Sequence, residues 1–116
     1  MHKVLKIFVV FLLLLTSAAD KAFAQYDKDV FFMRGRHALS EGRYAQAIGN
    51  FDVLTQLDTS DYWTFFFRGI AKYNLGDYSG AESDFNKSID KNSLYTQAYH
   101  YRAITKGETG RYEEAL

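Results

Sequence analysis

The chain has 116 residues, of which 47% are hydrophobic and 24% charged, a composition typical of one folded domain and not of a disordered chain. It contains no cysteine, which excludes disulfides, thiolate metal sites and cysteine nucleophiles. Basic and acidic residues balance at 14 each, so no basic surface indicates a nucleic-acid partner.

The first 24 residues have the pattern of a cleavable secretory signal. Lys3 and Lys6 form a positively charged start, and residues 7–15 are an unbroken apolar run with no amphipathic period. Small residues then stand at the two positions that a signal peptidase reads, Ala22 and Ala24. The pattern predicts cleavage after Ala24, membrane contact only in transit, and a protein exported to the periplasm or secreted.

A retained membrane anchor is the alternative interpretation of this segment. A transmembrane helix needs about 20 consecutive apolar residues. Here Thr16 and Ser17 weaken the apolar run before Asp20 and Lys21 end it. Cleavage is therefore the favoured interpretation, and it would leave residues 25–116 as the folded domain.

From residue 35 onward the sequence repeats itself with a period of 34 residues. Each unit has a small residue, then a glycine, a tyrosine two residues later, an alanine after three more, and a phenylalanine four residues beyond that. The aligned columns are Gly35, Gly69 and Ala103; Gly42, Gly76 and Gly110; Tyr44, Tyr78 and Tyr112; Ala47, Ala81 and Ala115; and Phe51 and Phe85.

Each column has a physical reason, and together they predict a helix, a tight turn and a second, antiparallel helix. The central glycine ends the first helix, because only glycine adopts the left-handed conformation at little cost. Tyrosine, alanine and phenylalanine at steps of three and four share one face of the second helix. The small residue upstream lets the two helices approach closely. The expected fold class is therefore all-α.

These motifs resemble the tetratricopeptide repeat, which has a bulky residue, leucine and glycine on its first helix, then tyrosine, alanine, phenylalanine, alanine and proline. The resemblance implies a right-handed α-solenoid domain over residues 25–116, with repeats over 28–61 and 62–95 and a partial repeat over 96–116. The sequence departs from the pattern at the leucine (Arg34, Arg68 and Arg102), the second alanine (Leu54 and Ser88) and the proline (Thr59 and Ser93). The breaks between repeats are then expected to depend on the turn-forming residues 58–61 and 92–93.

The third repeat reaches only the start of its expected second helix, at Glu113-Glu114-Ala115-Leu116. Solenoids need polar terminal caps, because each unit buries its apolar face on its neighbour. The chain is therefore expected to be a fragment of a longer repeat protein. The alternative is self-association through this open C-terminal end.

Motifs that carry chemistry are missing from the sequence. It has no phosphate-binding glycine loop, serine elbow, zinc-binding helix motif or calcium loop, so no enzyme, metal or cofactor is expected. Asn86-Lys87-Ser88 matches a glycosylation motif but falls within an expected helix, where an unmodified triplet is the simpler interpretation.

In proteins of this family the first helices line a concave groove that holds a peptide, and an aromatic run at 62–67 falls on one of them. Phe65 takes the bulky core position, so Trp63 and Phe66 either face the groove or pack against neighbouring repeats. The resemblance implies groove positions at Phe32, Arg36, Leu39, Trp63, Phe66, Ile70, Tyr73, Gln97, His100 and Ile104.

The expected function is binding of an unidentified protein or peptide through this aromatic groove. A clamp for a C-terminal carboxylate is not expected, because only Arg36 is basic among the positions that would form it, which are Phe32, Arg36, Phe67, Gln97 and Tyr101. Two alternatives stay open: a structural spacer or assembly platform of an envelope complex, and a docking module of an enzyme that continues beyond residue 116.

Overall fold

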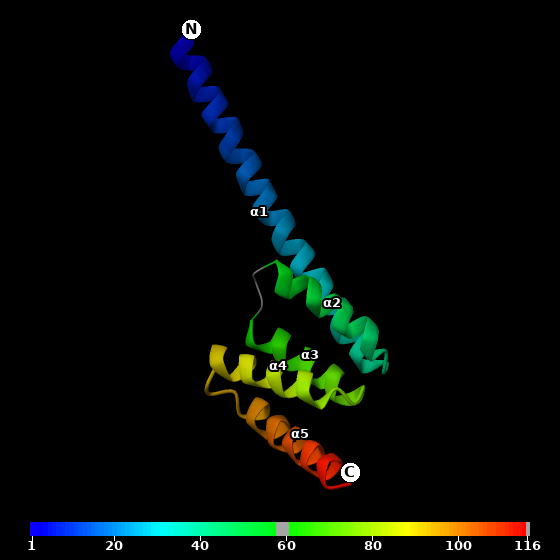
Figure 1. The fold of residues 1–116 in the computed structure, drawn as a ribbon. Coiled ribbons are helices and arrows are strands. Elements are labelled where there is room, and N and C mark those ends of the chain that lie inside the picture. Colours follow the sequence, from blue (N-terminus) through cyan, green and yellow to red (C-terminus); the bar gives the residue numbers. More distant parts are fainter. Residues whose placement is uncertain (58–60, 116) are drawn as a thin grey trace. The chain divides into compact units, whose positions relative to one another are not determined.

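The computed structural model describes the backbone of residues 1–57 and 61–115, and the side chains of 1–22, 27–57 and 61–111. Within these ranges the chain is helical and has no strand (Figure 1). The helices are α1 (His2–Ser40), α2 (Tyr44–Gln56), α3 (Tyr62–Asn74), α4 (Tyr78–Lys91) and α5 (Thr96–Ala115). The chain divides into two compact units, Met1–Val30 and Phe31–Leu116. The expected all-α class is confirmed.

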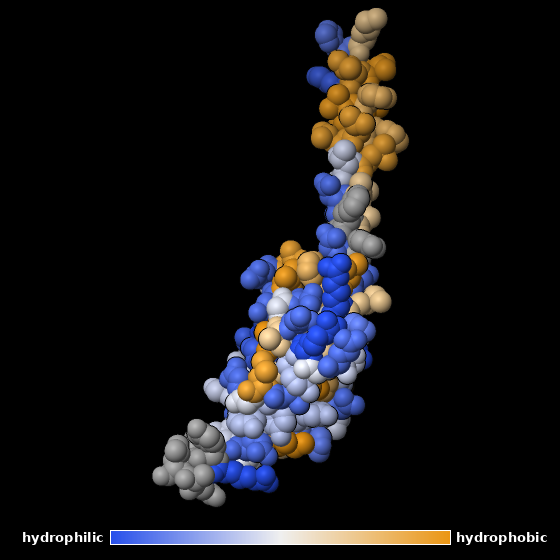
Figure 2. All heavy atoms as spheres, turned by 90° about the vertical axis from the view of Figure 1, so that its right-hand side faces the viewer, coloured by the Kyte–Doolittle hydropathy of each residue, from blue (hydrophilic) through white to orange (hydrophobic). Residues whose placement is uncertain are grey.

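The first unit is an apolar helical segment whose described side chains up to Ala22 are all exposed. Figure 2 shows hydrophobic side chains along this part of α1. By length and composition alone, α1 qualifies as a helix that could cross a membrane. The expected cleavage point after Ala24 lies among residues 23–26, whose side chains are outside the described part. The leader over residues 1–24 therefore stays a prediction.

The second unit contains two helical hairpins, and each turns at the glycine that the repeat predicts. Gly42 has φ of +74° and Gly76 has φ of +82°. After each glycine the next backbone N–H reaches five residues back, from Arg43 to the Ala38 carbonyl and from Asp77 to the Lys72 carbonyl, both at 2.9 Å. This is the hydrogen bond of a glycine-terminated helix. The predicted turns at both positions are confirmed.

Close approach of the two helices in each hairpin depends on the small residues upstream. A Cβ built on Gly35 would lie 2.5 Å from Cε1 of Phe51, and one on Gly69 would lie 2.7 Å from Cε1 of Phe85. Both phenylalanines are fully buried, as are the alanines four residues before them. The large-small-large face predicted for the second helices is therefore the core of the hairpins.

The third predicted glycine turn is wrong. α5 continues without interruption through Gly110, which does not have a positive φ, to Ala115. In the first two hairpins a buried phenylalanine holds the second helix against the first. The helix continues through Gly110 because glycine permits a left-handed turn without requiring one. The side chains of 112–116, which include Glu113 and Glu114, lie outside the described residues.

The second and third repeats are joined without proline. α3 begins at Tyr62 and α5 at Thr96, where repeats two and three were expected to begin. Before α5, the Asn92 side chain accepts a hydrogen bond from the Leu94 backbone N–H at 3.1 Å and so forms the turn. Residues 58–60, which were expected to break the chain before α3, are outside the described part.

Candidate functional site

Aromatic side chains from three helices form one connected network in the second unit. Phe32 of α1 lies 5.8 Å from Trp63 and 6.0 Å from Phe67, both of α3, measured between ring centroids. The network continues through Phe66, whose ring lies 5.3 Å from Phe67 and 5.5 Å from Tyr101 of α5. We name this network the aromatic face; its members are Phe32, Tyr62, Trp63, Phe66, Phe67, Tyr95 and Tyr101.

The consecutive aromatic residues of α3 point in different directions, because successive residues turn by about 100° around a helix. Trp63 is 45% exposed, and its indole N–H donates a hydrogen bond to Asp61 at 3.1 Å. Phe65 is buried, as expected for the bulky core position. Its ring lies within 5.7 Å of the cationic groups of Arg68, Lys87 and Lys91. Trp63 therefore presents the accessible surface of the aromatic face on α3.

Phe66 corrects the expectation that this side chain lines an accessible groove. It is only 2% exposed and belongs to the core cluster with Ala81, Phe85 and Ala98. Tyr95 packs edge-on against it at 5.0 Å. The physical reason is that α5 packs against Phe66 and buries its side chain. The Phe66 ring therefore supports the aromatic face and does not belong to its accessible surface.

The remaining expected groove residues differ in how far they are exposed. Arg36 and His100 are exposed, whereas Leu39, Ile70 and Tyr73 are half-buried. Leu39 packs against the core cluster around Phe51, and Ile70 and Tyr73 pack against the cluster around Phe85. Gln97 and Ile104 are exposed on α5. Among the expected groove residues, the structure thus leaves accessible Arg36, Trp63, Gln97, His100 and Ile104.

The guanidinium of Arg36 lies over the rings of the aromatic face. Its guanidinium carbon is 4.1 Å from the ring centroid of Phe67 and 6.0 Å from that of Phe32. This is a cation–π arrangement, which holds the side chain in place while its N–H donors stay in water.

Two tyrosines at the edges of this region have raised pKa values. Burial raises the pKa of Tyr95 most, the nearby Tyr62 adds to the rise, and the positive charge of Arg36 opposes it. Burial also raises the pKa of Tyr73, with a further contribution from the negative charge of Glu108. Arg36 therefore lies close enough to Tyr95 for its charge to act on the hydroxyl group.

A buried ion-pair network lies behind the aromatic face, and the sequence interpretation missed it. Arg68 donates two hydrogen bonds to Asp84, at 2.7 and 2.8 Å, and a third to Asp52 at 2.9 Å. Lys72 contacts the same Asp84 carboxylate at 3.0 Å. Burial disfavours the charged guanidinium, but the two carboxylates outweigh it, so the pKa of Arg68 is raised above its ordinary value. The signal in the sequence was an arginine where the family has leucine, because an arginine buried at such a position needs a carboxylate partner.

The same contact recurs one repeat later. Arg68 donates a hydrogen bond to Asp52 of the preceding hairpin. Arg102 and Asn86, each 34 residues further along the chain, form the equivalent hydrogen bond at 3.0 Å. Arginines at this position therefore join consecutive repeats. In the triplet 86–88, Asn86 is exposed and accepts a hydrogen bond from Arg102, whereas Ser88 is fully buried.

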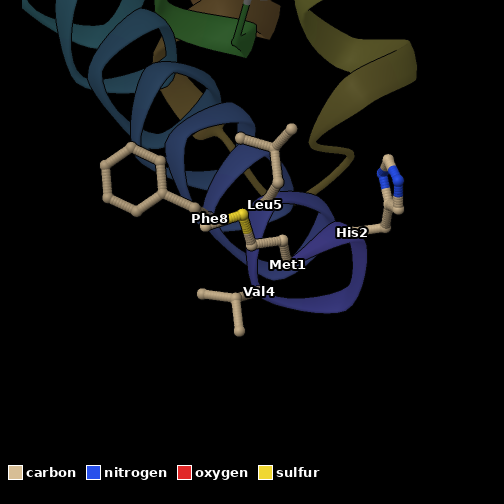
Figure 3. Close-up of a pocket in the computed structure, with 5 residues that line it drawn as sticks. All are labelled: Met1, His2, Val4, Leu5 and Phe8. Carbon is tan, nitrogen blue, oxygen red and sulfur yellow. The ribbon is translucent and has the colours of Figure 1, made fainter.

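Chemistry beyond binding finds no support among the described side chains. No group of three or more histidine or acidic side chains in this part of the chain could hold a metal ion. One hollow is lined by Met1, His2, Val4, Leu5 and Phe8 (Figure 3). Because all five come from the first turns of one helix, no second element encloses it, and it is an apolar surface and not a substrate cavity.

Several known proteins are similar to the chain over most of its length. Photosystem I assembly protein Ycf3 of Rippkaea orientalis is 31% identical over 96 residues, which cover 74% of this chain and 56% of that protein. Its counterpart in Cuscuta gronovii is 29% identical over 92 residues, covering 77% and 51%. Human superkiller complex protein 3 is 27% identical over 105 residues, covering 90% of this chain but 7% of that protein. The chain thus spans about half or less of these relatives.

The architecture defines a protein built from antiparallel helical hairpins with a 34-residue period. No family model matches the chain. The repeat columns and the two glycine-turned hairpins fit a fragment of a tetratricopeptide-repeat protein, the class that the sequence pattern resembles. The relatives are named for assembly and for membership of a complex, and none for a catalytic activity.

The expected export to the periplasm or out of the cell is wrong. The proteins that overturn it are the photosystem I assembly proteins of Cuscuta gronovii, Cuscuta obtusiflora and Rippkaea orientalis, which are not exported proteins. The error arose because a short positive start followed by an apolar run was interpreted as an export address. A positive start, an apolar run and small residues at 22 and 24 fit the pattern of an export signal, but the pattern by itself does not establish where a protein is located.

Proposed function

We propose that the second unit binds a protein partner through its aromatic face, and that this binding serves the assembly of a multiprotein complex. The observation that carries the proposal is Trp63, which is 45% exposed and yet held by Asp61 and by ring contacts with Tyr62 and Phe32. A rigid, half-exposed tryptophan contributes a large contact area at low entropic cost, and tryptophan is enriched among the residues that dominate binding energies.

The relatives favour assembly as the context of this binding. Three of them are named for the assembly of photosystem I and a fourth for a protein complex. Because the chain spans only part of each relative, the partner is proposed by its class, a subunit or peptide of a larger complex, and not by its name. A docking module of a longer enzyme stays an untested alternative.

The proposal is tested by site-specific photo-crosslinking in cells that express the chain. A photoreactive amino acid replaces Trp63 in one variant and Leu94, which is 87% exposed and outside the aromatic face, in the other. A discrete crosslinked protein is expected with the first variant only. Truncation of Trp63 to alanine should weaken capture of that protein by about thirtyfold, because an anchor contributes about 2 kcal/mol.

The unfolding midpoint separates binding from stability. The Trp63→Ala variant is expected to unfold close to the native midpoint, since the side chain is half exposed. Equal crosslinking from both positions would show that the aromatic face has no special role. Unaltered capture by Trp63→Ala together with a collapsed midpoint would show that Trp63 serves the core.

A further inference from the structure

The exposed arginine on the aromatic face has no carboxylate partner among the described side chains. Three other arginines in this part of the chain are paired with carboxylates: Arg43 with Glu41, Arg68 with Asp84 and Asp52, and Arg111 with Glu108. Arg102 is engaged by the amide oxygen of Asn86. Arg36, in contrast, is held by ring faces, with its guanidinium carbon 4.1 Å from the centroid of Phe67.

Packing against the aromatic rings preorganises the Arg36 guanidinium to bind an anion. The rings of Phe67 and Phe32 restrict the side chain, so less conformational entropy is lost when the N–H donors form a second contact. The acidic group near the exposed tryptophan is already engaged, because Asp61 accepts the indole N–H of Trp63. The surface around Arg36 therefore combines one free positive charge with adjacent apolar rings.

We propose that Arg36 selects partners by binding an acidic side chain that lies next to a bulky apolar side chain in the partner's sequence. The carboxylate would accept hydrogen bonds from the guanidinium, and the apolar neighbour would cover Phe32 and Trp63, whose rings are 5.8 Å apart. This proposal rests on the proposed binding function and specifies its partner chemistry. The carboxylate is that of an aspartate or glutamate within a segment, because Arg36 is the single basic residue at the positions where a terminal carboxylate would be clamped.

The test uses four pools of octapeptides that share a random apolar background. Three pools are acetylated and amidated and have glutamate, glutamine or lysine at one fixed position, and the fourth has the glutamine sequence with a free C-terminus. Binding to the full chain is followed through the fluorescence of Trp63, the single tryptophan in the sequence. Trp63 lies beside Phe32, which itself lies under Arg36, so a bound peptide changes its surroundings.

The glutamate pool is expected to bind about tenfold more tightly than the glutamine pool, as a hydrogen bond to a charged group predicts. This preference should disappear in Arg36→Gln and persist in Arg43→Gln, which removes an exposed arginine already paired with Glu41. It should also weaken as salt is raised, because the contact is exposed. Circular dichroism of both variants verifies that each remains helical.

The other outcomes overturn defined parts of the reasoning. Equal binding of the glutamate and glutamine pools, or a glutamate preference that survives in Arg36→Gln, refutes the role of Arg36 but leaves the aromatic face as a binding surface. Tighter binding of the free C-terminus than of the glutamate pool refutes the side-chain carboxylate as the ligand. No fluorescence change with any pool refutes the proposed binding function as well.

Discussion

Replacing Gly69 with alanine tests whether close helix packing in the second hairpin depends on the missing side chain. The added Cβ would lie 2.7, 3.0 and 3.1 Å from three ring carbons of Phe85. Carbon atoms in contact prefer about 3.5–4.0 Å, so the ring would have to retreat by about 1 Å. Phe85 is fully buried in a cluster with Ala81, Ala98 and Phe66, which leaves it no space to retreat into.

Two opposing terms decide the magnitude of this change. Overpacking of a well-packed core costs about 1–3 kcal/mol, and here the contact is short enough to suggest the upper half of that range. Alanine recovers about 1 kcal/mol relative to glycine through its helix propensity. We therefore expect Gly69→Ala to lower the free energy of unfolding by about 1–2 kcal/mol, which corresponds to a fall in Tm of about 4–8 °C per kcal/mol.

Gly49→Ala is the matched control. Gly49 lies within α2, and a Cβ built there would meet nothing within 4 Å, so only the helix-propensity term remains. This variant should be more stable by up to about 1 kcal/mol. Urea unfolding followed by circular dichroism at 222 nm measures both variants against the native chain.

A double variant isolates the contact itself. With Phe85→Leu in the background, the cost of Gly69→Ala should largely disappear, because the ring that the new Cβ meets has been removed. If Gly69→Ala unfolds at the same urea concentration as Gly49→Ala, or at a higher one, glycine is not needed for the close approach. The explanation that the small residues at 35 and 69 let the two helices of each hairpin approach closely would then be wrong.

Further predictions concern the buried charges and the other turns. Asp84→Ala should lower the free energy of unfolding by about 3 kcal/mol or more, because the buried Arg68 loses its carboxylate partner; a change below 1 kcal/mol by urea unfolding would contradict this. Ser88→Ala restores the alanine of the repeat pattern and removes a buried hydroxyl with no hydrogen-bond partner, so the Tm should rise. Gly76→Val should cost about 1 kcal/mol or more through strain at φ of +82°, and an unchanged melting temperature would refute the strained turn. Gly110→Ala should stabilise the chain by up to about 1 kcal/mol if α5 is continuous there, whereas destabilisation would favour a turn.

The repeat register determined much of the fold in advance. Glycine at 42 and 76 predicted left-handed turns, and the small residues at 35 and 69 predicted the approach of Phe51 and Phe85. These features depend on contacts within one hairpin, over about 16 residues of sequence. A single sequence is informative about such contacts because the 34-residue period shows each of them twice.

Sequence reasoning gave wrong predictions in two places, the location inferred from the N-terminal segment and the turn expected at Gly110. Hydrophobicity identified residues 7–15 as a separate apolar segment but did not identify where the protein is located. At Gly110 the glycine was present, but glycine permits a turn without requiring one. In the first two hairpins the buried Phe51 and Phe85 pack directly against the glycines of the first helices.

The sequence by itself determined the period, the hairpin and the residues that could meet within each repeat, because these follow from local spacing along the chain. Only the tertiary structure decided which side chains of the aromatic run are accessible. Phe66 and Trp63 are three residues apart on one helix, yet the approach of α5 buries the first and leaves the second half exposed. The partners of Arg68 were decided in the same way, because Asp52 and Asp84 lie 16 residues away on either side and meet only when the hairpins pack.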